Sequence, residues 1–188
     1  MTKGDAAVIK DMSEIGAVGH RIVQGAEVFT KTTIVTDEVI DQIDGLADLA
    51  HVHNHANALA LRACKKVIPE TTPQVVVFDT AFHQTMPPKA YMFGMPYECY
   101  EQFHVRKYGF HGTSHRFVSM KYGEVTGKSL EGLNIVSCHL GNGSSITAIK
   151  DGKSVDTSMG FTPLDGIIMG TRSGSVDPVS YTHLTLPT

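Results

Sequence analysis

Apolar residues recur along the first half of the chain in short runs whose spacing predicts strands and helices. Residues 17–23 form a short run with one arginine inside it, and residues 75–78 form a wholly apolar run that ends at Asp79. Both runs are typical of strands, and the second is typical of a buried strand. Thr36 precedes a segment with apolar residues on one side at helical spacing, and residues 57–68 repeat that spacing up to a proline. This half therefore predicts a strand, two helices and a second strand.

The second half begins with residues 84–96, where repeated prolines predict an irregular segment. Helical spacing returns after Ser114, which has the side chain of a helix N-cap. The helix that follows would carry Phe117, Val118 and Met120 as its apolar residues.

Two apolar strands, residues 135–140 and 144–149, follow that helix closely. Asp151-Gly152 is a strong signal for a tight hairpin turn, and Val155 would begin a third strand after it. Strands and helices alternate without a long linker. The pattern as a whole predicts a mixed α/β fold.

Composition and charge exclude several classes of protein. The chain has 188 residues with 41% hydrophobic and 19% charged residues, which is ordinary for a globular protein. Its net charge of −3 argues against broad attraction to nucleic acid or to an anionic membrane. The three cysteines form no CxxC pair, which favours a reducing cytoplasm over a disulfide framework. Neither a signal peptide nor an apolar run of membrane length is evident.

Residues 105–115 are the most informative segment for function. The sequence VRKYGFHGTSH combines basic residues, histidines, glycines and hydroxyls with an aromatic pair. It is too polar for a core and too specialised in composition for a plain connection. It indicates a loop that binds a charged, oxygen-rich substrate.

A glycine-rich turn joins the two strands at residues 140–145. Its glycines could let backbone N–H groups face a phosphate, and His139 would add a donor at the same place. An ordinary Asn-Gly hairpin turn is the alternative interpretation.

Three further features carry charge or metal-binding side chains. Arg172 lies in a loop of turn residues, where it could hold carboxylate or phosphate oxygens or remain solvated. Asp79 could act in a site at the end of its strand or cap the backbone that follows. Three alternating histidines, His51, His53 and His55, could form a metal cluster or begin a helix.

Together these segments resemble acetate kinase, in the superfamily of actin-like ATPases and sugar kinases. The resemblance extends from about Ile15 to Pro178 and rests on blocks whose order and spacing fit the family. The blocks are residues 18–21, 77–87, 105–115, 138–143, 155–160 and 169–178.

The resemblance implies a ribonuclease H-like fold of two α/β domains with the active site in the cleft. Residues 1–82 would be part of the first domain, and residues 83–178 the first part of the second, nucleotide-binding domain. Residues 179–188 look unlike the family. Because the family has about twice this length, we expect the chain to be a fragment, with adenosine-binding segments and metal ligands outside it.

The resemblance also implies roles for individual residues. The catalytic residues would be Asp79, His111 and Arg172. Arg21 would bind the carboxylate of the acid and His53 would assist it. The pocket for its methyl group would be lined by Val23, Val52, Phe110 and Pro163. The phosphates of ATP would contact His139, Leu140, Gly141, Asn142 and Gly143.

Several residues depart from the family pattern. Gln24 replaces a histidine, Ala26 a glycine and His55 a proline. Ala26 would be disfavoured if the backbone there needs a positive φ. Val52 stands where leucine is usual, so the pocket could admit an acid longer than acetate.

The expected activity is transfer of phosphate between ATP and acetate or propionate, with Mg²⁺, in a cytoplasmic protein whose full-length form is a homodimer. No nucleic acid or membrane partner is expected. The alternatives are an inactive truncated remnant that at most binds anions, and a histidine-rich metal-binding domain.

Overall fold

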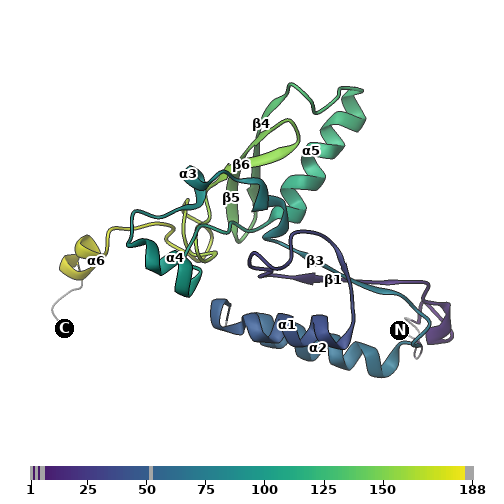
Figure 1. Cartoon of the computed structure of the whole chain (residues 1–188). Coiled ribbons are helices and arrows are strands. Elements are labelled where there is room, and N and C mark those ends of the chain that lie inside the picture. Colours follow the sequence, from purple (N-terminus) through teal and green to yellow (C-terminus); the bar gives the residue numbers. More distant parts are fainter. Residues whose placement is uncertain (1, 3, 5–6, 51–52, 185–188) are drawn as a thin grey trace. The chain divides into compact units, whose positions relative to one another are not determined.

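The structure is a computed structural model that describes residues 2, 4, 7–50 and 53–184. The chain forms two compact units, Met1–Ala81 and Phe82–Thr188, which are described separately. Within the described ranges, every helix is too short or too polar to cross a membrane. The mixed α/β architecture predicted from the sequence is confirmed, with one small sheet in each unit (Figure 1).

The sheet of the first unit brings the carboxyl ends of two predicted strands together. Its order is β1 (Val18–Ile22), β3 (Gln74–Phe78) and β2 (Thr33–Ile34). β1 and β3 are parallel, and β2 is antiparallel to β3. The short strand β2 has no clear signal in the sequence. Because parallel strands end at the same edge of a sheet, residues just beyond Ile22 and Phe78 become neighbours.

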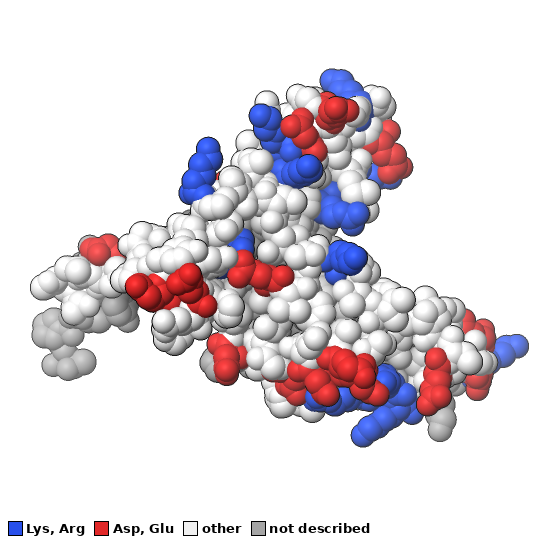
Figure 2. All heavy atoms as spheres, viewed as in Figure 1, with Lys and Arg blue, Asp and Glu red and all other residues white. Residues whose placement is uncertain are grey.

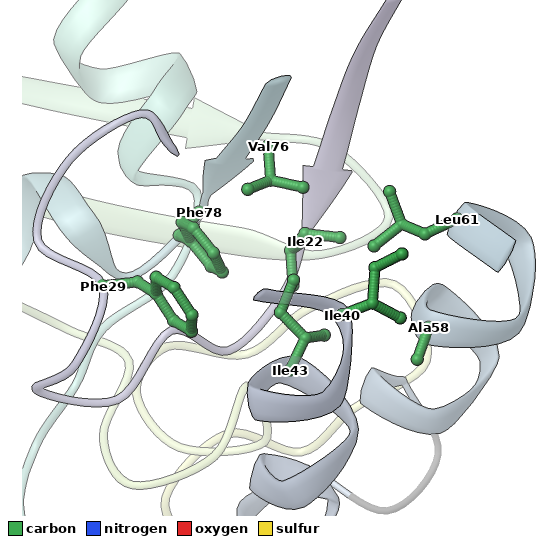
Figure 3. Packing of buried hydrophobic residues seen from close by; sticks show 8 residues of the cluster. All are labelled: Ile22, Phe29, Ile40, Ile43, Ala58, Leu61, Val76 and Phe78. Atoms are coloured by element: carbon green, nitrogen blue, oxygen red, sulfur yellow. The ribbon is translucent and has the colours of Figure 1, made fainter. Parts of the chain in front are cut away.

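Helices α1 (Asp37–Gly45) and α2 (Asn54–Val67) pack on this sheet, with the 3₁₀ turn η2 (Leu46–Leu49) beside them, and a 3₁₀ turn η1 (Met12–Glu14) precedes β1. Thr36 caps α1 by accepting a hydrogen bond from the Val39 amide at 3.2 Å, as its sequence predicts. α2 begins three residues earlier than expected. The core of the unit is shown in Figure 3 and consists of Ile22, Phe29, Ile40, Ile43, Ala58, Leu61, Val76 and Phe78.

Charged side chains of both signs lie side by side over α1 and α2 (Figure 2). Arg62 donates to Asp41 and Asp44, at 2.8 and 2.7 Å. His55 contacts the same Asp44 at 2.8 Å. His55 thus shares a partner with Arg62 on the surface of α1 and α2.

The loop after β1 contains a strained alanine. Ala26 has φ 48° and is 5% exposed. Its amide donates to Gln24 Oε1 at 2.9 Å. The backbone of Gln24 in turn exchanges two hydrogen bonds with the side chain of Asn54 at the start of α2. The expected conflict at Ala26 is therefore real, because its surroundings hold the backbone in a region that favours glycine.

We expect Ala26→Gly to raise the free energy of unfolding of the first unit by about 0.5–1 kcal/mol, since glycine removes the left-handed penalty but adds chain entropy. Hydrogen exchange of the β3 amides would measure it. Ala63→Gly, at an exposed position inside α2, is the control and should lower stability by about 1 kcal/mol. A loss of protection in Ala26→Gly would contradict the strain.

The second unit has an antiparallel sheet of β4 (Asn134–Leu140), β5 (Ser144–Lys150) and β6 (Lys153–Thr157), in that order. Asp151 and Gly152 join β5 to β6 with φ values of 52° and 73°. Positive φ at both positions is the geometry of the predicted two-residue hairpin turn. The three strands predicted here are confirmed to within a residue or two at their ends.

Helix α5 (Gly112–Thr126) lies alongside β4 (Figure 1) and differs from its prediction in two ways. It begins at Gly112, and its N-cap position is held by His111 and not by Ser114. Its exposed residues include Phe117, Val118 and Met120, the apolar residues whose spacing predicted the helix. The face toward the sheet is instead polar, because the buried helix residues are Gly112, His115 and Ser119.

The remaining elements are short. η3 (Ala81–Thr85) follows β3, and α3 (Pro88–Tyr91) starts with proline at its first position, where a missing N–H costs nothing. The segment expected to be irregular therefore contains one short helix. α4 (Tyr97–Phe103) has no clear sequence signal, and α6 (Pro178–Leu184) lies near the end of the described residues.

Candidate active site

Arg21 and Asp79, both expected in the site, form a two-point ion pair in the first unit. Arg21 Nε donates to Asp79 Oδ1 at 3.0 Å, and Nη2 donates to Oδ2 at 2.6 Å. The parallel register sets Arg21 opposite Val77, two positions before the aspartate. The Asp79 side chain is 2% exposed, whereas that of Arg21 is 64% exposed. The strand pairing alone therefore brings these residues together.

This pairing leaves Arg21 able to bind a second anion. A guanidinium carries five N–H groups in a planar fork, and Asp79 accepts from one edge of that fork. The hydrogen bond to Asp79 raises the pKa of Arg21 above its ordinary value, so the group stays cationic. Asp79 thus orients an exposed arginine whose other edge can hold a carboxylate.

In the second unit, residues 141–143 connect β4 to β5 without any positive φ. A hairpin turn of the common two-residue Asn-Gly type would need positive φ at both residues, so this three-residue hairpin connection is of another type. The lack of a side chain at Gly143 leaves room for two neighbouring side chains. A Cβ there would lie 3.2 Å from His111 Nε2 and 3.3 Å from Arg172 Nη1. The missing side chain lets these two nitrogens approach one point.

The loop of Arg172 is held on the same turn. The Gly170 amide donates to the Asn142 carbonyl at 3.1 Å, and a Cβ on Gly170 would collide with Asn142 Oδ1 at 2.7 Å. Arg172 Nη1 donates to the Pro163 carbonyl at 3.0 Å. These contacts fix the arginine half-buried and not solvated, and Pro163 contributes through its backbone oxygen.

His111 holds a strained position at the start of α5. Its φ and ψ are 57° and 20°, in the left-handed region, where a non-glycine residue costs about 1–2 kcal/mol. The helix that follows has 15 residues, and its N-terminal amides carry partial positive charge. With the nearby arginine, this arrangement can stabilise an anionic group such as a phosphoryl group.

A buried chain of histidines and serines supports His111. Its Nδ1 contacts Ser145 Oγ at 2.9 Å, and Ser145 Oγ contacts His115 Nε2 at 2.8 Å. His115 Nδ1 contacts Ser137 Oγ at 2.9 Å. Burial, helped by the neighbouring imidazoles, lowers the pKa of His115 to about 3. His115 is therefore neutral near pH 7, with one donor and one acceptor nitrogen.

His139 stacks on His111 with ring centroids 4.0 Å apart and planes 21° from parallel. Its Nδ1 contacts Ser114 Oγ at 2.9 Å, so the hydroxyl expected to cap α5 binds this ring instead. The residue expected at the nucleotide phosphates thus lies directly beside the residue expected at the transferring phosphoryl group.

Residues 1–187 match the Acetokinase family. The chain belongs to this family. It is 56% identical over 184 residues to an acetate kinase from Thermoanaerobacterium thermosaccharolyticum, and 58% identical over 171 residues to one from Desulfitobacterium hafniense. These alignments cover 98% and 91% of the chain but 46% and 43% of the relatives. The chain spans about half the length of the curated relatives it matches.

Solved structures show the same fold. An acetate kinase from Porphyromonas gingivalis superposes with a TM-score of 0.91 at 46% identity, over 97% of this chain and 46% of that one. A propionate kinase from Francisella tularensis gives 0.85 at 45% identity, over 93% and 44%. The predicted fold class is confirmed. The domain boundary at residues 82/83 and the separate tail from residue 179 stay predictions, and the family match includes residues 179–187.

The other expected site residues of this acetokinase family member are placed in different surroundings. His53 is exposed at the start of α2, and Val23 is partly buried after β1. Phe110 is 3% exposed, and its carbonyl accepts a hydrogen bond from His83 at 2.9 Å. Leu140 is 74% exposed at the end of β4. Val52 lies outside the described residues, so its expected role in the pocket stays a prediction.

The possible metal cluster predicted from the sequence involves His51, His53 and His55. His51 lies outside the described part of the chain, and among the residues within it no group of three His, Cys, Asp or Glu side chains could hold a metal. The histidine-rich metal-binding alternative therefore has no support. Both oxygens of the buried Asp79 accept hydrogen bonds from Arg21, so its expected role toward Mg²⁺ stays a prediction.

The sequence did not predict the residues that hold the expected site residues in place. Ser145 and Ser137 hold His111 and His115, and Gln24 and Asn54 hold the loop after β1. One signal was available for the serines. Small hydroxyl residues alternate along the sheet at Ser145 and Thr147, on the buried face of a strand.

Proposed function

We propose that this chain supplies acid-binding and phosphoryl-binding residues of a kinase that transfers phosphate between ATP and acetate or propionate. The approach of His111 Nε2 and Arg172 Nη1 to one point at Gly143 carries the proposal. Membership of the acetokinase family supports the same class of reaction.

In this reaction a carboxylate oxygen of the acid attacks the γ-phosphorus of ATP. The bond from phosphorus to the β,γ-bridging oxygen breaks, ADP leaves with that electron pair, and an acyl phosphate forms. Arg21 holds the acid's carboxylate, and Asp79 keeps the guanidinium turned toward it. Arg172 and His111 donate hydrogen bonds to the phosphoryl oxygens, where negative charge must be stabilised during transfer. Turn residues 139–143 contact the nucleotide phosphates.

Magnesium, when bound with ATP, would supply further positive charge at the phosphates. Asp79 is the residue of this chain that we propose to be near it. A homodimeric, cytoplasmic full-length protein remains an expectation from the family resemblance. Size-exclusion chromatography with light scattering would measure the oligomeric state.

Hydroxylamine trapping of acyl phosphate tests the proposed function. Two proteins would be compared: the 188-residue chain, and a chimera in which the parts of the Thermoanaerobacterium relative outside the match are joined to this chain. With ATP, Mg²⁺ and acetate, we expect the chimera to give acyl hydroxamate. The chain alone should give none, since its relatives use about twice this length.

The unmodified relative, prepared in the same way, is the control. A folded chimera that makes no acyl phosphate while the relative does would refute the proposal. Turnover by the chain alone would show that these residues suffice. The same assay with acetate, propionate and butyrate measures the acid preference, and an unchanged preference for acetate would rule out the wider pocket expected from Val52.

A further inference from the structure

The buried chain Ser137–His115–Ser145–His111 crosses between α5 and the sheet and ends at the candidate phosphoryl site. Its three contacts are 2.8–2.9 Å long. His115 and Ser145 are 0% exposed and Ser137 is 4% exposed. Water therefore has little access to these groups, so they must find their hydrogen-bond partners among the atoms of the protein.

The donors and acceptors in this chain cannot be assigned independently. Ser145 has one hydroxyl hydrogen and faces two imidazole nitrogens, so it donates to one and accepts from the other. One of the two nitrogens, His115 Nε2 or His111 Nδ1, therefore carries hydrogen and the other does not. Neutral His115 has a single N–H, so the choice also determines whether Ser137 donates or accepts.

When both imidazoles are neutral, only two arrangements of their hydrogens satisfy all three contacts. In the first, Ser137 donates to His115, His115 donates to Ser145, and Ser145 donates to His111 Nδ1. The remaining hydrogen of His111 is then on Nε2, the nitrogen that lies near Gly143 and Arg172. In the second, each hydrogen bond has the opposite direction: His111 Nδ1 donates to Ser145, Ser145 donates to His115, and His115 donates to Ser137. Nε2 of neutral His111 then bears a lone pair.

An anion selects between these arrangements. A phosphoryl oxygen beside Nε2 accepts hydrogen bonds and repels a lone pair, so it favours the first arrangement. Arg172 Nη1 approaches the same point as a second donor, and His139 stacks on the ring.

We propose that His115 and Ser145 are positioning residues that couple their proton arrangement to His111, so that in the anion-bound state Nε2 of His111 carries hydrogen and faces Gly143 and Arg172. The inference rests on the proposed function only in assigning a phosphoryl group to His111. The coupling itself can be measured without any kinase activity.

His83 offers a matched comparison within the same unit. Its Nδ1 contacts the buried hydroxyl of Ser154 at 2.9 Å, as His111 contacts Ser145. Its Nε2 must donate, since its partner is the Phe110 carbonyl at 2.9 Å. The tautomer of His83 is therefore determined by a carbonyl, outside the chain that includes His111.

Long-range ¹H–¹⁵N NMR of the histidine-labelled 188-residue chain tests the proposal, because protonated and bare imidazole nitrogens have well-separated ¹⁵N shifts. We expect the unmodified chain to show one of the two paired arrangements. Saturating inorganic phosphate should give Nε2–H on both His111 and His115. Ser145→Ala should uncouple the two rings, so that His111 carries Nε2–H in saturating phosphate whether or not His115 does. Ser154→Ala should leave the coupling intact.

Three results would overturn the inference. Hydrogen on both or on neither of His115 Nε2 and His111 Nδ1 in the unmodified chain would exclude the coupling, and this holds even if Ser145→Ala fails to fold. A bare His111 Nε2 at saturating phosphate would exclude its role as the donor. A coupling that survives in Ser145→Ala would exclude Ser145 as the link. A chimera without kinase activity whose tautomers stay coupled would refute the proposed function and leave the inference standing.

Discussion

Replacing Arg172 with alanine should lower kcat of the chimera by about 10²–10³-fold, with a smaller effect on KM for the acid. Loss of one fixed donor to the charge that develops in a transition state has this magnitude. Arg172 suits that role because Nη1 approaches Gly143 together with His111 Nε2 and is held there by the Pro163 carbonyl. Steady-state kinetics with hydroxylamine trapping would measure the change.

Two further variants separate charge at the site from charge elsewhere. Arg172→Lys should recover part of the lost activity, because lysine restores the positive charge but not the planar fork. Arg62→Ala removes an arginine that pairs with Asp41 and Asp44 on the surface of α1 and α2, and we expect kcat to be unchanged. Equal losses in Arg172→Ala and Arg62→Ala, or none in either, would contradict the role of Arg172.

Gly109→Ala should destabilise the second unit by about 3 kcal/mol or more. Gly109 has φ +70°, and a Cβ there would lie 2.3 Å from Thr157 Cγ2 and 2.9 Å from His83 Cδ2. Both neighbours are buried, and His83 is held by hydrogen bonds at both ring nitrogens. The left-handed penalty and the overpacking therefore add. All six tyrosines lie after residue 82 and the chain has no tryptophan, so tyrosine fluorescence during urea unfolding reports this unit.

Gly132→Ala is the matched control for that measurement. Gly132 has a similar φ of +76°, but a Cβ there would meet nothing within 4 Å. We expect a loss of about 1 kcal/mol from the backbone conformation alone. If the two variants lost the same stability, the close packing around Gly109 would not be the cause of its effect.

The elements that the sequence predicted well are those whose signals are local. Thr36 caps α1 as expected, and Asp151-Gly152 forms the expected tight turn. Such signals depend on one residue's φ preference or on a hydrogen bond across three positions. The positive φ at Ala26, raised as a possible conflict from the family's glycine, is another local property that the sequence revealed.

Apolar spacing indicated a helix at α5, but it does not reveal which face of that helix is buried. Phe117, Val118 and Met120 are exposed, while His115 and Ser119 are buried. Periodicity assumes that the buried face is apolar. Here buried polar groups satisfy one another across the helix and sheet, and a hydrophobic pattern does not detect that arrangement.

The candidate site also combines features that are local in the sequence with contacts between distant residues. The residue types, the family and the positions of Arg21, Asp79, His111 and Arg172 follow from motifs that are contiguous in the sequence. Their partners do not. Arg21 binds Asp79 from 58 positions away, and His111 and His115 meet Ser145 across 34 and 30 positions.

The sequence by itself determined the family, most of the local elements and which side chains we propose for the chemistry, because motifs and turn residues act over a few positions. Only the tertiary structure decided that Asp79 holds Arg21 and that a buried serine joins His111 to His115. Strand register and helix packing set those contacts. Each depends on where distant segments meet, and hydrogen bonds form only within about 3 Å of the right partner.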